Sequence, residues 1–324
     1  MPSRSDDPAN PLRGAAAWAP LDTAVVLATG RDAVRFVDNF ATAALSPLKA
    51  GQGTEAFFAD ARGWVLALTT ILRTADGLAI LAAPGAGPRL RDHLDRYHIR
   101  EALELTDASA QVATLLVAGP EARDWLVRLG VEALPQVATE HIDAEFDGGS
   151  VRIVRVEGQG ADGFWLQAEP PVADRIAARL QAAGLPRAEP PDIEAMRIEA
   201  CFPAPHDMPE KTLPQELGRD ARAISFTKGC YLGQETVARL DALGHVNRRL
   251  VLVTLDTPQA PTTPVAVSHA GERVGTITSA CLSPRRGRPV GLGLMQTRAI
   301  TLAGLQVEGS AATVAGIAGT GDMA

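Results

Sequence analysis

A strand, a glycine and a helix follow one another at two places in this sequence of 324 residues, and this recurrence constrains the fold more than any other feature. The apolar run 23–29 has the length of a strand, and Gly30 separates it from a predicted helix. The run 114–117 leads in the same way through Gly119 into a predicted helix at 121–129. Further strand patterns and an amphipathic helix follow each start, an order that suits helices packed on a mainly antiparallel sheet. We therefore predict an α+β fold with two similar units.

The composition changes after Gly244, where short strand patterns alternate with Pro, Gly and Asp turns. The strand candidates are 250–255, 265–268, 273–278, 290–295 and 304–307. Regularly spaced short strands are typical of a small β-barrel or sandwich. We expect the chain to divide into a disordered tail at 1–20, a first α+β unit at 21–110, a second unit at 111–245, a C-terminal β-barrel at 246–310, and a tail or last strand at 311–324.

Charge and residue usage argue against several classes of function. The net charge of −7 disfavours general nucleic-acid binding, which needs a basic face. No apolar run reaches the length of about 18 residues that predicts a membrane span. The three cysteines form no Cys-x-x-Cys pair, so neither a disulfide framework nor a zinc site is predicted. The start of the chain has no apolar signal core, which favours the cytoplasm, although its Ala and Arg content leaves an organellar matrix open.

Two glycines, Gly229 and Gly233, bracket a cysteine and an aromatic residue. Glycine allows a tight turn or the close approach of a ligand to the backbone. A helix is predicted directly afterwards, at 234–243, with a glycine as its C-terminal stop. Cys230 therefore lies just ahead of a helix N-terminus and two residues after Lys228, and both features favour a thiolate. The alternative is that Cys230 is a small buried hydrophobic side chain, as most free cysteines are.

This stretch resembles the motif of the YgfZ-type folate-binding proteins, the iron–sulfur-assembly branch of the glycine-cleavage T-protein (aminomethyltransferase) superfamily. The fixed positions of that motif are present as Lys228, Gly229, Cys230, Tyr231, Gly233, Gln234, Glu235 and Arg239. The segment 197–200 resembles the superfamily's Arg-x-Glu-Ala-Gly, with Cys201 in place of the last glycine, and 213–216 and 275–293 resemble later family elements. The resemblance implies two α+β units and a barrel around a central folate-sized opening.

The resemblance also implies a site for tetrahydrofolate or a one-carbon derivative. The family carboxylate that reads the pterin ring corresponds to Glu199, and a carboxylate can accept two parallel N–H bonds. Without the resemblance, Glu199 would be read as a solvated carboxylate at a helix end. Cations for the glutamate tail are expected from Arg197, Arg239 and the loop at 285–286, since Arg suits a planar carboxylate. The motif adds three candidate cofactor-binding residues: Lys228, Tyr231 and Gln234.

The glycine-rich segment 158–163 formally matches the dinucleotide fingerprint Gly-x-Gly-x-x-Gly. That fingerprint must open a helix, whereas 164–167 is strand-like and Asp162-Gly163 is a hairpin signal. We therefore reject a nicotinamide site. The resemblance instead implies a turn before a strand that lines the folate pocket.

Whether the protein is an enzyme depends on an acid that the sequence lacks. The resemblance places Leu66 and Ala67 where true aminomethyltransferases need an aspartate for methylene transfer. No acid occurs between Arg62 and Arg73, and a chemical step cannot use an absent group.

The leading hypothesis is a tetrahydrofolate-binding accessory protein that assists iron–sulfur cluster assembly, transfer or repair. Cys230 would be its working thiol, assisted by Lys228, and its partners would be iron–sulfur client or assembly proteins. We expect a monomer with no metal site. One alternative is a folate-dependent one-carbon transferase or demethylase with an acid supplied elsewhere, and another is a folate-independent interaction scaffold.

Overall fold

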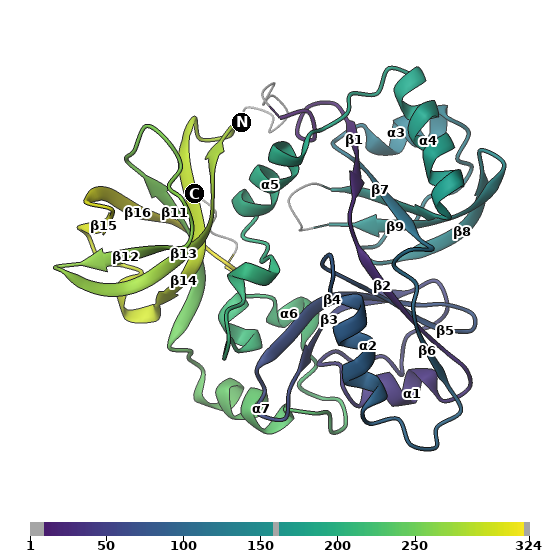
Figure 1. The fold of residues 1–324 in the computed structure, drawn as a ribbon, viewed down its shortest axis with the longest axis horizontal. Coiled ribbons are helices and arrows are strands. Elements are labelled where there is room, and N and C mark those ends of the chain that lie inside the picture. The colour runs from purple at the N-terminus through teal and green to yellow at the C-terminus, as the bar shows by residue number, and fades with distance from the viewer. Residues whose placement is uncertain (1–9, 158–161, 321–324) are drawn as a thin grey trace.

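The structure is a computed structural model that describes residues 10–157 and 162–320. Within these residues the chain forms two five-stranded antiparallel sheets with helices packed on them, and a closed barrel of six strands (Figure 1). The predicted fold class, two similar α+β units followed by a small barrel, is confirmed. No helix in the described ranges is both long and apolar enough to cross a bilayer.

The first unit is a sheet with two helices on one of its faces. Its elements are β2 (Ala24–Thr29), α1 (Ala33–Asp38), β3 (Gly53–Ala59), β4 (Val65–Arg73), β5 (Gly77–Ala82), α2 (Gly87–Asp95) and β6 (Glu104–Asp107). The strand order is β3-β4-β5-β2-β6. Alternate strand residues point to opposite faces, and those that face the helices form a core with Phe36, Phe58 and Leu94 at its centre.

The second unit repeats this arrangement. Its elements are β7 (Ala113–Ala118), α3 (Ala122–Arg128), β8 (His141–Phe146), β9 (Gly149–Val156), β10 (Gly163–Ala168) and α4 (Pro170–Ala182). Read from β8, the strand order is β8-β9-β10-β7-β1, which matches the first sheet position by position. The fifth strand differs in origin: β6 follows α2 along the chain, whereas β1 (Ala17–Leu21) comes from the start of the chain.

The segment 10–20 is therefore folded, and the expectation of a disordered tail there was wrong. β1 pairs antiparallel with β7, with Ala17 opposite Ala118, and both Leu12 and Trp18 are buried. Pro20 hid this strand in the sequence, yet proline is tolerated in an edge strand, where one side of the backbone has no partner. Residues 1–9 lie outside the described part.

The β10 strand tests the interpretation of the glycine-rich segment 158–163. Residues 158–161 lie outside the described part, so the turn predicted there is not visible. β10 itself begins at Gly163, and it pairs with both β7 and β9. The strand-like reading of 164–167, which excluded the dinucleotide fingerprint, is confirmed.

The faces of the two sheets that carry no helices pack against each other. Leu72 and Leu81 from the first sheet meet Leu116, Val154 and Trp165 from the second in one buried cluster. This sheet-on-sheet contact places the ends of strands from both units around a common space.

A connecting region of short helices leads from the second unit to the barrel. Its elements are α5 (Pro190–Glu199), η1 (Pro205–Asp207), η2 (Pro214–Leu217), α6 (Asp220–Ala223) and α7 (Gln234–Leu243). α5 runs between the barrel and the second unit, whereas α7 lies beside the first unit (Figure 1). α7 has the predicted bounds, and Gly244 caps it with a left-handed φ of 68°.

The barrel closes through antiparallel pairs. Its strands are β11 (Arg248–Leu255), β12 (Val265–His269), β13 (Glu272–Ser283), β14 (Arg288–Gln296), β15 (Leu305–Val307) and β16 (Ser310–Ile317), with η3 (Thr297–Ala299) between β14 and β15. The order is β11-β14-β13-β12-β15-β16. β16 pairs with β11 and completes the barrel, so the barrel extends to Ile317, into the segment 311–324 for which a tail or a last strand was expected.

Candidate functional site

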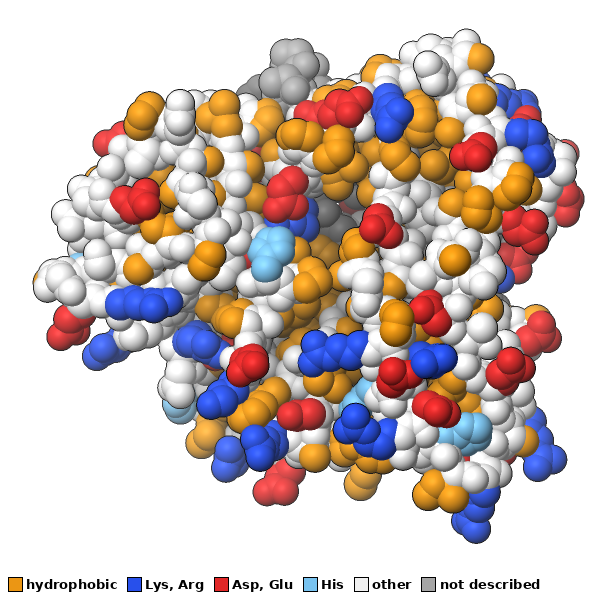
Figure 2. Space-filling view, in the orientation of Figure 1, with side chains coloured by type: hydrophobic (Ala, Val, Ile, Leu, Met, Phe, Trp, Pro, Cys, Tyr) orange, Lys and Arg blue, Asp and Glu red, His pale blue; other side chains and the backbone are white. Residues whose placement is uncertain are grey.

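A cavity of about 520 Å³ lies where the two sheets meet α5. Figure 2 shows the molecule hollowed between the barrel and the two units, with apolar side chains around the hollow. Its apolar lining comes from both sheets and from the helix: Leu68, Leu81, Leu116, Trp165, Ile193 and Met196. Such a size and lining are typical of small-molecule sites. We call this space the central cavity.

Few polar groups reach the central cavity. The lining residues with polar side chains include Asp22, Glu55, Thr70, Glu194 and Arg197. Glu55 is buried in β3 and faces Arg219, whose Nε donates to Glu55 Oε2 at 2.9 Å and whose Nη2 contacts Oε1. The planar guanidinium fits both carboxylate oxygens at once, which fixes the Glu55 side chain. This pair ties the connecting region to the first sheet beside the cavity.

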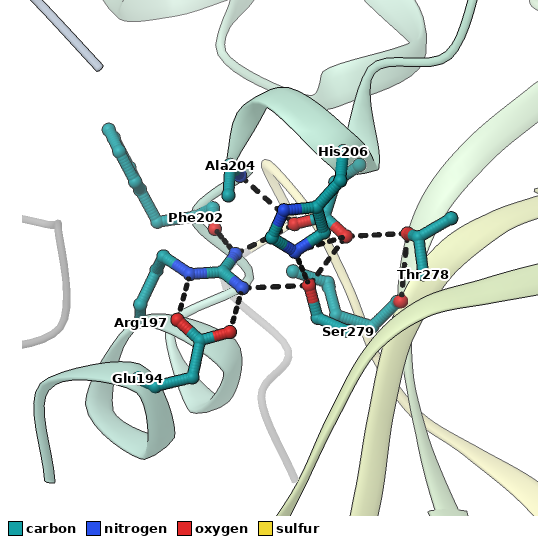
Figure 3. A network of polar contacts seen from close by, with 9 residues as sticks. Glu194, Arg197, Phe202, Ala204, His206, Thr278 and Ser279 are labelled. Atoms are coloured by element: carbon teal, nitrogen blue, oxygen red, sulfur yellow. Dashed lines mark hydrogen bonds and ion pairs between the residues drawn. The ribbon is translucent and has the colours of Figure 1, made fainter. Parts of the chain in front are cut away.

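Arg197 is a hub between α5, the connecting region and the barrel (Figure 3). Its Nε donates to Glu194 at 2.8 Å, and its Nη1 donates to Phe202 O and Asp207 Oδ2, both at 2.7 Å. Its Nη2 donates to Glu194 and to Ser279 Oγ, at 2.5 and 2.7 Å. A guanidinium has five N–H donors, and all five have partners here. Arg197 lines the cavity, but it offers no free donor to the glutamate tail of folate, for which it was expected.

Asp207, at the end of η1, connects this network to the barrel. It is fully buried, and its Oδ1 accepts from the hydroxyls of Thr278 and Ser279 at 2.5 and 2.7 Å. His206 Nε2 lies 2.7 Å from the same Ser279 hydroxyl (Figure 3). Burial acts to lower the pKa of Arg197, but the carboxylates of Glu194 and Asp207 outweigh it and raise that pKa. The charged network therefore holds α5, one wall of the cavity, against β13.

Glu199 does not face the central cavity, and the expectation that it reads a pterin there is not supported. It is 1% exposed and points toward the barrel, where Ser283 Oγ donates to its Oε1 and Arg285 N lies at 3.3 Å. Arg13 Nη2 approaches the other oxygen at 2.8 Å. α5 is buried on both sides, so its hydrophobic spacing did not fix which face meets the cavity. The α5 carboxylate that lines the cavity is Glu194.

Lys228 is a structural clamp. Its ammonium donates to the carbonyl oxygens of Asp38, Ala41 and Ala43 at 2.6, 2.9 and 2.8 Å, and it lies 2.9 Å from Asp38 Oδ1. The side chain is only 4% exposed. These contacts fix the motif loop to the segment after α1. Since the ammonium is committed to them, the predicted roles of Lys228 beside Cys230 and in ligand binding are not supported.

The other motif residues lie away from the central cavity. Cys230 is exposed, whereas Tyr231 is buried over the Lys228 ammonium, and burial raises the pKa of Tyr231 to about 12. Gln234 begins α7, and Arg239 is exposed on the same helix. None of these four lines the central cavity, so the structure does not bring the predicted motif ligands together with Glu199 or Arg197.

A second cavity of about 850 Å³, the side chamber, adjoins the first. It lies between β4 and α2, and Leu66 and Ala67 form part of its wall. The two spaces share the lining residues Leu68, Ala83, Pro84, Pro205 and Met208. The aliphatic pair at 66 and 67, where an acid was sought, therefore stands close to the junction of the two spaces.

Sequence reasoning missed Glu55, Glu194 and Trp165 as cavity residues. Glu55 carried a usable signal, because it is a charged residue in an otherwise apolar strand and a buried charge needs a partner. Glu194 lies three residues before Arg197, the spacing of helical neighbours. Trp165 was not singled out, because an aromatic residue in a strand is ordinary core material, although the resemblance had implied that the strand containing it lines the folate pocket.

The sequence matches two protein-family models that together cover most of the chain. The GCVT N-terminal domain matches at residues 23–228. The glycine cleavage T-protein C-terminal barrel domain matches at residues 248–316. The boundary between the two matches falls at α7, between the second unit and the barrel.

Similar proteins come from bacteria and a plant. A chloroplastic relative from Arabidopsis thaliana is 27% identical over 282 residues, which is 85% of this chain and 63% of the relative. The aminomethyltransferase of Synechocystis is 28% identical over 62% of this chain and 54% of its own length. The tRNA-modifying protein YgfZ of Yersinia pseudotuberculosis is 28% identical over 80% of this chain and 78% of its own. This chain thus spans little more than half to about three quarters of these relatives.

The fold has a solved counterpart. The aminomethyltransferase T of the Bartonella henselae glycine cleavage system superposes with a TM-score of 0.83, covering 94% of this chain and 86% of the other. Identity between the two is 18%, so this likeness concerns the fold alone.

Proposed function

The chain belongs to the glycine cleavage T-protein family, and from that premise we propose that it is a folate-binding accessory protein of iron–sulfur cluster assembly, transfer or repair. Proteins of this family bind tetrahydrofolate or its derivatives. The central cavity is the place for the pterin ring in this chain. Its apolar lining suits a flat aromatic ring, and Thr70 supplies a hydroxyl at its wall. Glu194 also lies there, and its two oxygens, which accept from Arg197, each retain a second lone pair for a ligand N–H.

The observation that carries the proposal is the aliphatic wall at the junction of the two cavities. Leu66, Ala67 and Leu68 stand there, and β4 contains no carboxylate. Glu55 is already committed to Arg219. A chain that keeps the cavity but offers no free acid on β4 is suited to bind a folate without transferring its one-carbon group.

Cys230 supports the accessory role. It is exposed in the turn before α7, on a loop fixed by the Lys228 clamp. An exposed thiol on a loop that is held in place can contact a partner protein directly, whereas a group inside the central cavity cannot. The relative named YgfZ is the similar protein that favours this branch of the family. Cytoplasmic iron–sulfur client or assembly proteins would be the partners, and the cluster would be cargo.

Folate binding is tested by calorimetry with tetrahydrofolate. We expect micromolar-range affinity for the wild type and about tenfold weaker binding for Glu194→Gln, which removes a charge from the cavity wall. Glu145→Gln, on the exposed edge of the second sheet, is the matched control and should bind as the wild type does. The absence of heat and of any thermal shift with wild-type protein would refute the folate site.

The cluster role is tested in cells that lack this gene. Wild type should restore the activity of iron–sulfur enzymes, and Cys230→Ala should not. Cys281→Ala is the control, because Cys281 lies in β13, away from the motif loop. Full rescue by Cys230→Ala would refute the proposal that Cys230 is the working thiol.

The alternative is a folate-dependent one-carbon transferase. Glu194 is the observation in its favour, because it is a carboxylate at the cavity wall. Formation of methylene-tetrahydrofolate from an aminomethylated lipoyl carrier protein by the wild type, and its loss in Glu194→Gln, would establish this alternative over the accessory role.

A further inference from the structure

α2 turns a row of basic side chains toward the side chamber. Arg89, His93 and Arg96 all line it. Their spacing of four and three residues places them on one face of a helix. Both arginines are exposed, and within the described ranges neither guanidinium has a hydrogen bond or ion pair. The chamber therefore presents two available cations on one wall.

His93 shows that this wall also has an unsatisfied polar group. Its side chain is 9% exposed, and its Nε2 has no hydrogen-bond partner among the described residues. Its ring packs edge-on against Phe40 and Tyr97, which holds it beside the chamber. Buried polar atoms without partners are rare because they lose the hydrogen bonds of water.

Three carboxylates also line the chamber, those of Asp60, Asp92 and Glu210, but within the described residues none of them forms an ion pair with Arg89 or Arg96. Asp60 Oδ1 accepts from the backbone N–H groups of Arg62 and Trp64 at 2.9 and 3.0 Å. Asp92 is held by its neighbour Arg91, whose Nε lies at 3.0 Å. Glu210, on the opposite wall, is exposed to solvent. The N–H donors of the two guanidinium groups are therefore unoccupied by these acids, and an anion that enters can pair with them directly.

The side chamber continues the central cavity. Leu68, Ala83, Pro84, Pro205 and Met208 line both spaces. A ligand with an apolar ring in the central cavity can extend past Leu68 and Met208 into the chamber. The part of it that enters would meet Arg89 and Arg96.

We propose that Arg89 and Arg96 bind the carboxylates of the γ-glutamyl tail of a folate whose ring lies in the central cavity. This inference rests on the folate-binding function proposed above. In this proposal Arg89 and Arg96 take the place of Arg197 and Arg239 as ligands of the tail. The donors of Arg197 are all engaged, and Arg239 lies on α7 away from both cavities. Arg forms paired hydrogen bonds with planar carboxylates, and each added glutamate brings one more carboxylate to the chamber.

The test compares three probes by calorimetry: tetrahydropterin, which has no tail, tetrahydrofolate with one glutamate, and its tri-γ-glutamate form. Wild type should bind them with increasing affinity in that order. In Arg89→Gln/Arg96→Gln the affinity for the tri-γ-glutamate form should fall by about tenfold or more, and tetrahydropterin should bind unchanged. Arg100→Gln is the control, since Arg100 is exposed and does not line the chamber.

The outcomes distinguish failure of the tail site from failure of the proposed folate-binding function. If wild type binds none of the probes, the folate function fails. If wild type binds all three equally, or if the double variant loses tetrahydropterin and the glutamylated forms alike, the ring site stands and the tail site is refuted. Arg89→Lys/Arg96→Lys should recover part of the lost affinity, because the charge is restored without the paired geometry.

Discussion

At the scale of single residues, the Lys228 clamp fixes the motif loop to the first unit. Removing one partner of a buried charge pair leaves the other unpaired and costs about 3–5 kcal/mol. We expect Lys228→Met to lower the free energy of unfolding by about that amount in urea denaturation, because Asp38 and two further carbonyls lose their donor. Lys49→Met, at an exposed lysine, is the control. A change below about 1 kcal/mol would contradict the clamp.

Asp38 makes part of this stability depend on pH. Burial acts to raise the pKa of Asp38, but the hydrogen bonds from Leu45 N and Lys228 outweigh it and hold that pKa below its ordinary value. Its contribution is therefore present above about pH 4, the unfolded value, and is lost as pH falls through the folded value. Asp38→Asn should be less stable than wild type at pH 7, and the gap should close in acid. A gap that is constant from pH 7 to pH 3 would contradict this.

The three cysteines should differ in reactivity. Burial raises the pKa of Cys201 to about 11 and the pKa of Cys281 to about 12, whereas Cys230 is exposed. Only the thiolate reacts. Alkylation at pH 8, followed by mass spectrometry, should modify Cys230 at least about 100-fold faster than the other two. If Cys230 reacts slowest, it cannot be the working thiol.

At the scale of elements, the start of α7 is docked on the turn between β3 and β4. A Cβ at Gly233 would lie 2.5 Å from Asp60 O and 2.9 Å from Gly63 Cα. Gly244, at the other end of α7, has a similar left-handed φ but open space around it. Gly244→Ala should therefore cost only about 1 kcal/mol of backbone strain. Gly233→Ala should cost clearly more in chemical denaturation, and equal costs would mean that this contact does not hold the motif.

The same element shows what the sequence could predict. α7 has an apolar face, a glycine before it and a glycine after it, so its bounds followed from local signals. The orientation of α5 did not, because both of its sides are buried and periodicity cannot choose between them. The resemblance pointed to Glu199, whereas the structure turns Glu199 toward the barrel and places Glu194 at the cavity wall. β1 was missed because a strand with a proline at a sheet edge has little local signal, and its partner β7 is distant in the sequence.

At the scale of the whole molecule, the resemblance and the recurrence together predicted the two units, the barrel and a central opening, but not the side chains that line the cavities. Those are made by side chains from segments far apart in sequence, and spacing cannot predict which faces meet. Arg197 was expected at the glutamate tail, but spacing could not show that its donors are taken by Asp207 in the connecting region and Ser279 in the barrel.

The segment 10–21 supplies β1, the edge strand of the second sheet, and its removal should destabilise that sheet. A variant that begins at Asp22 loses the buried Leu12 and Trp18 and leaves the edge of β7 uncovered. We expect it to lose about 4 kcal/mol or more of stability and to associate through the open edge in size-exclusion chromatography. Arg13→Gln, which keeps the strand, should remain unassociated. A monomeric and equally stable variant would show that β1 is dispensable.

The origin of β1 also sets an order of events on the ribosome. β2 can pair with β5 as soon as the first unit has emerged, but β1 must wait for β7, roughly 90 residues later, on the order of 5 to 20 seconds at ordinary rates of translation. Throughout that delay an apolar strand has no partner of its own while the first sheet forms beside it. Nascent chains are therefore most open to mispairing at β1, and slower elongation across the first unit prolongs that exposure.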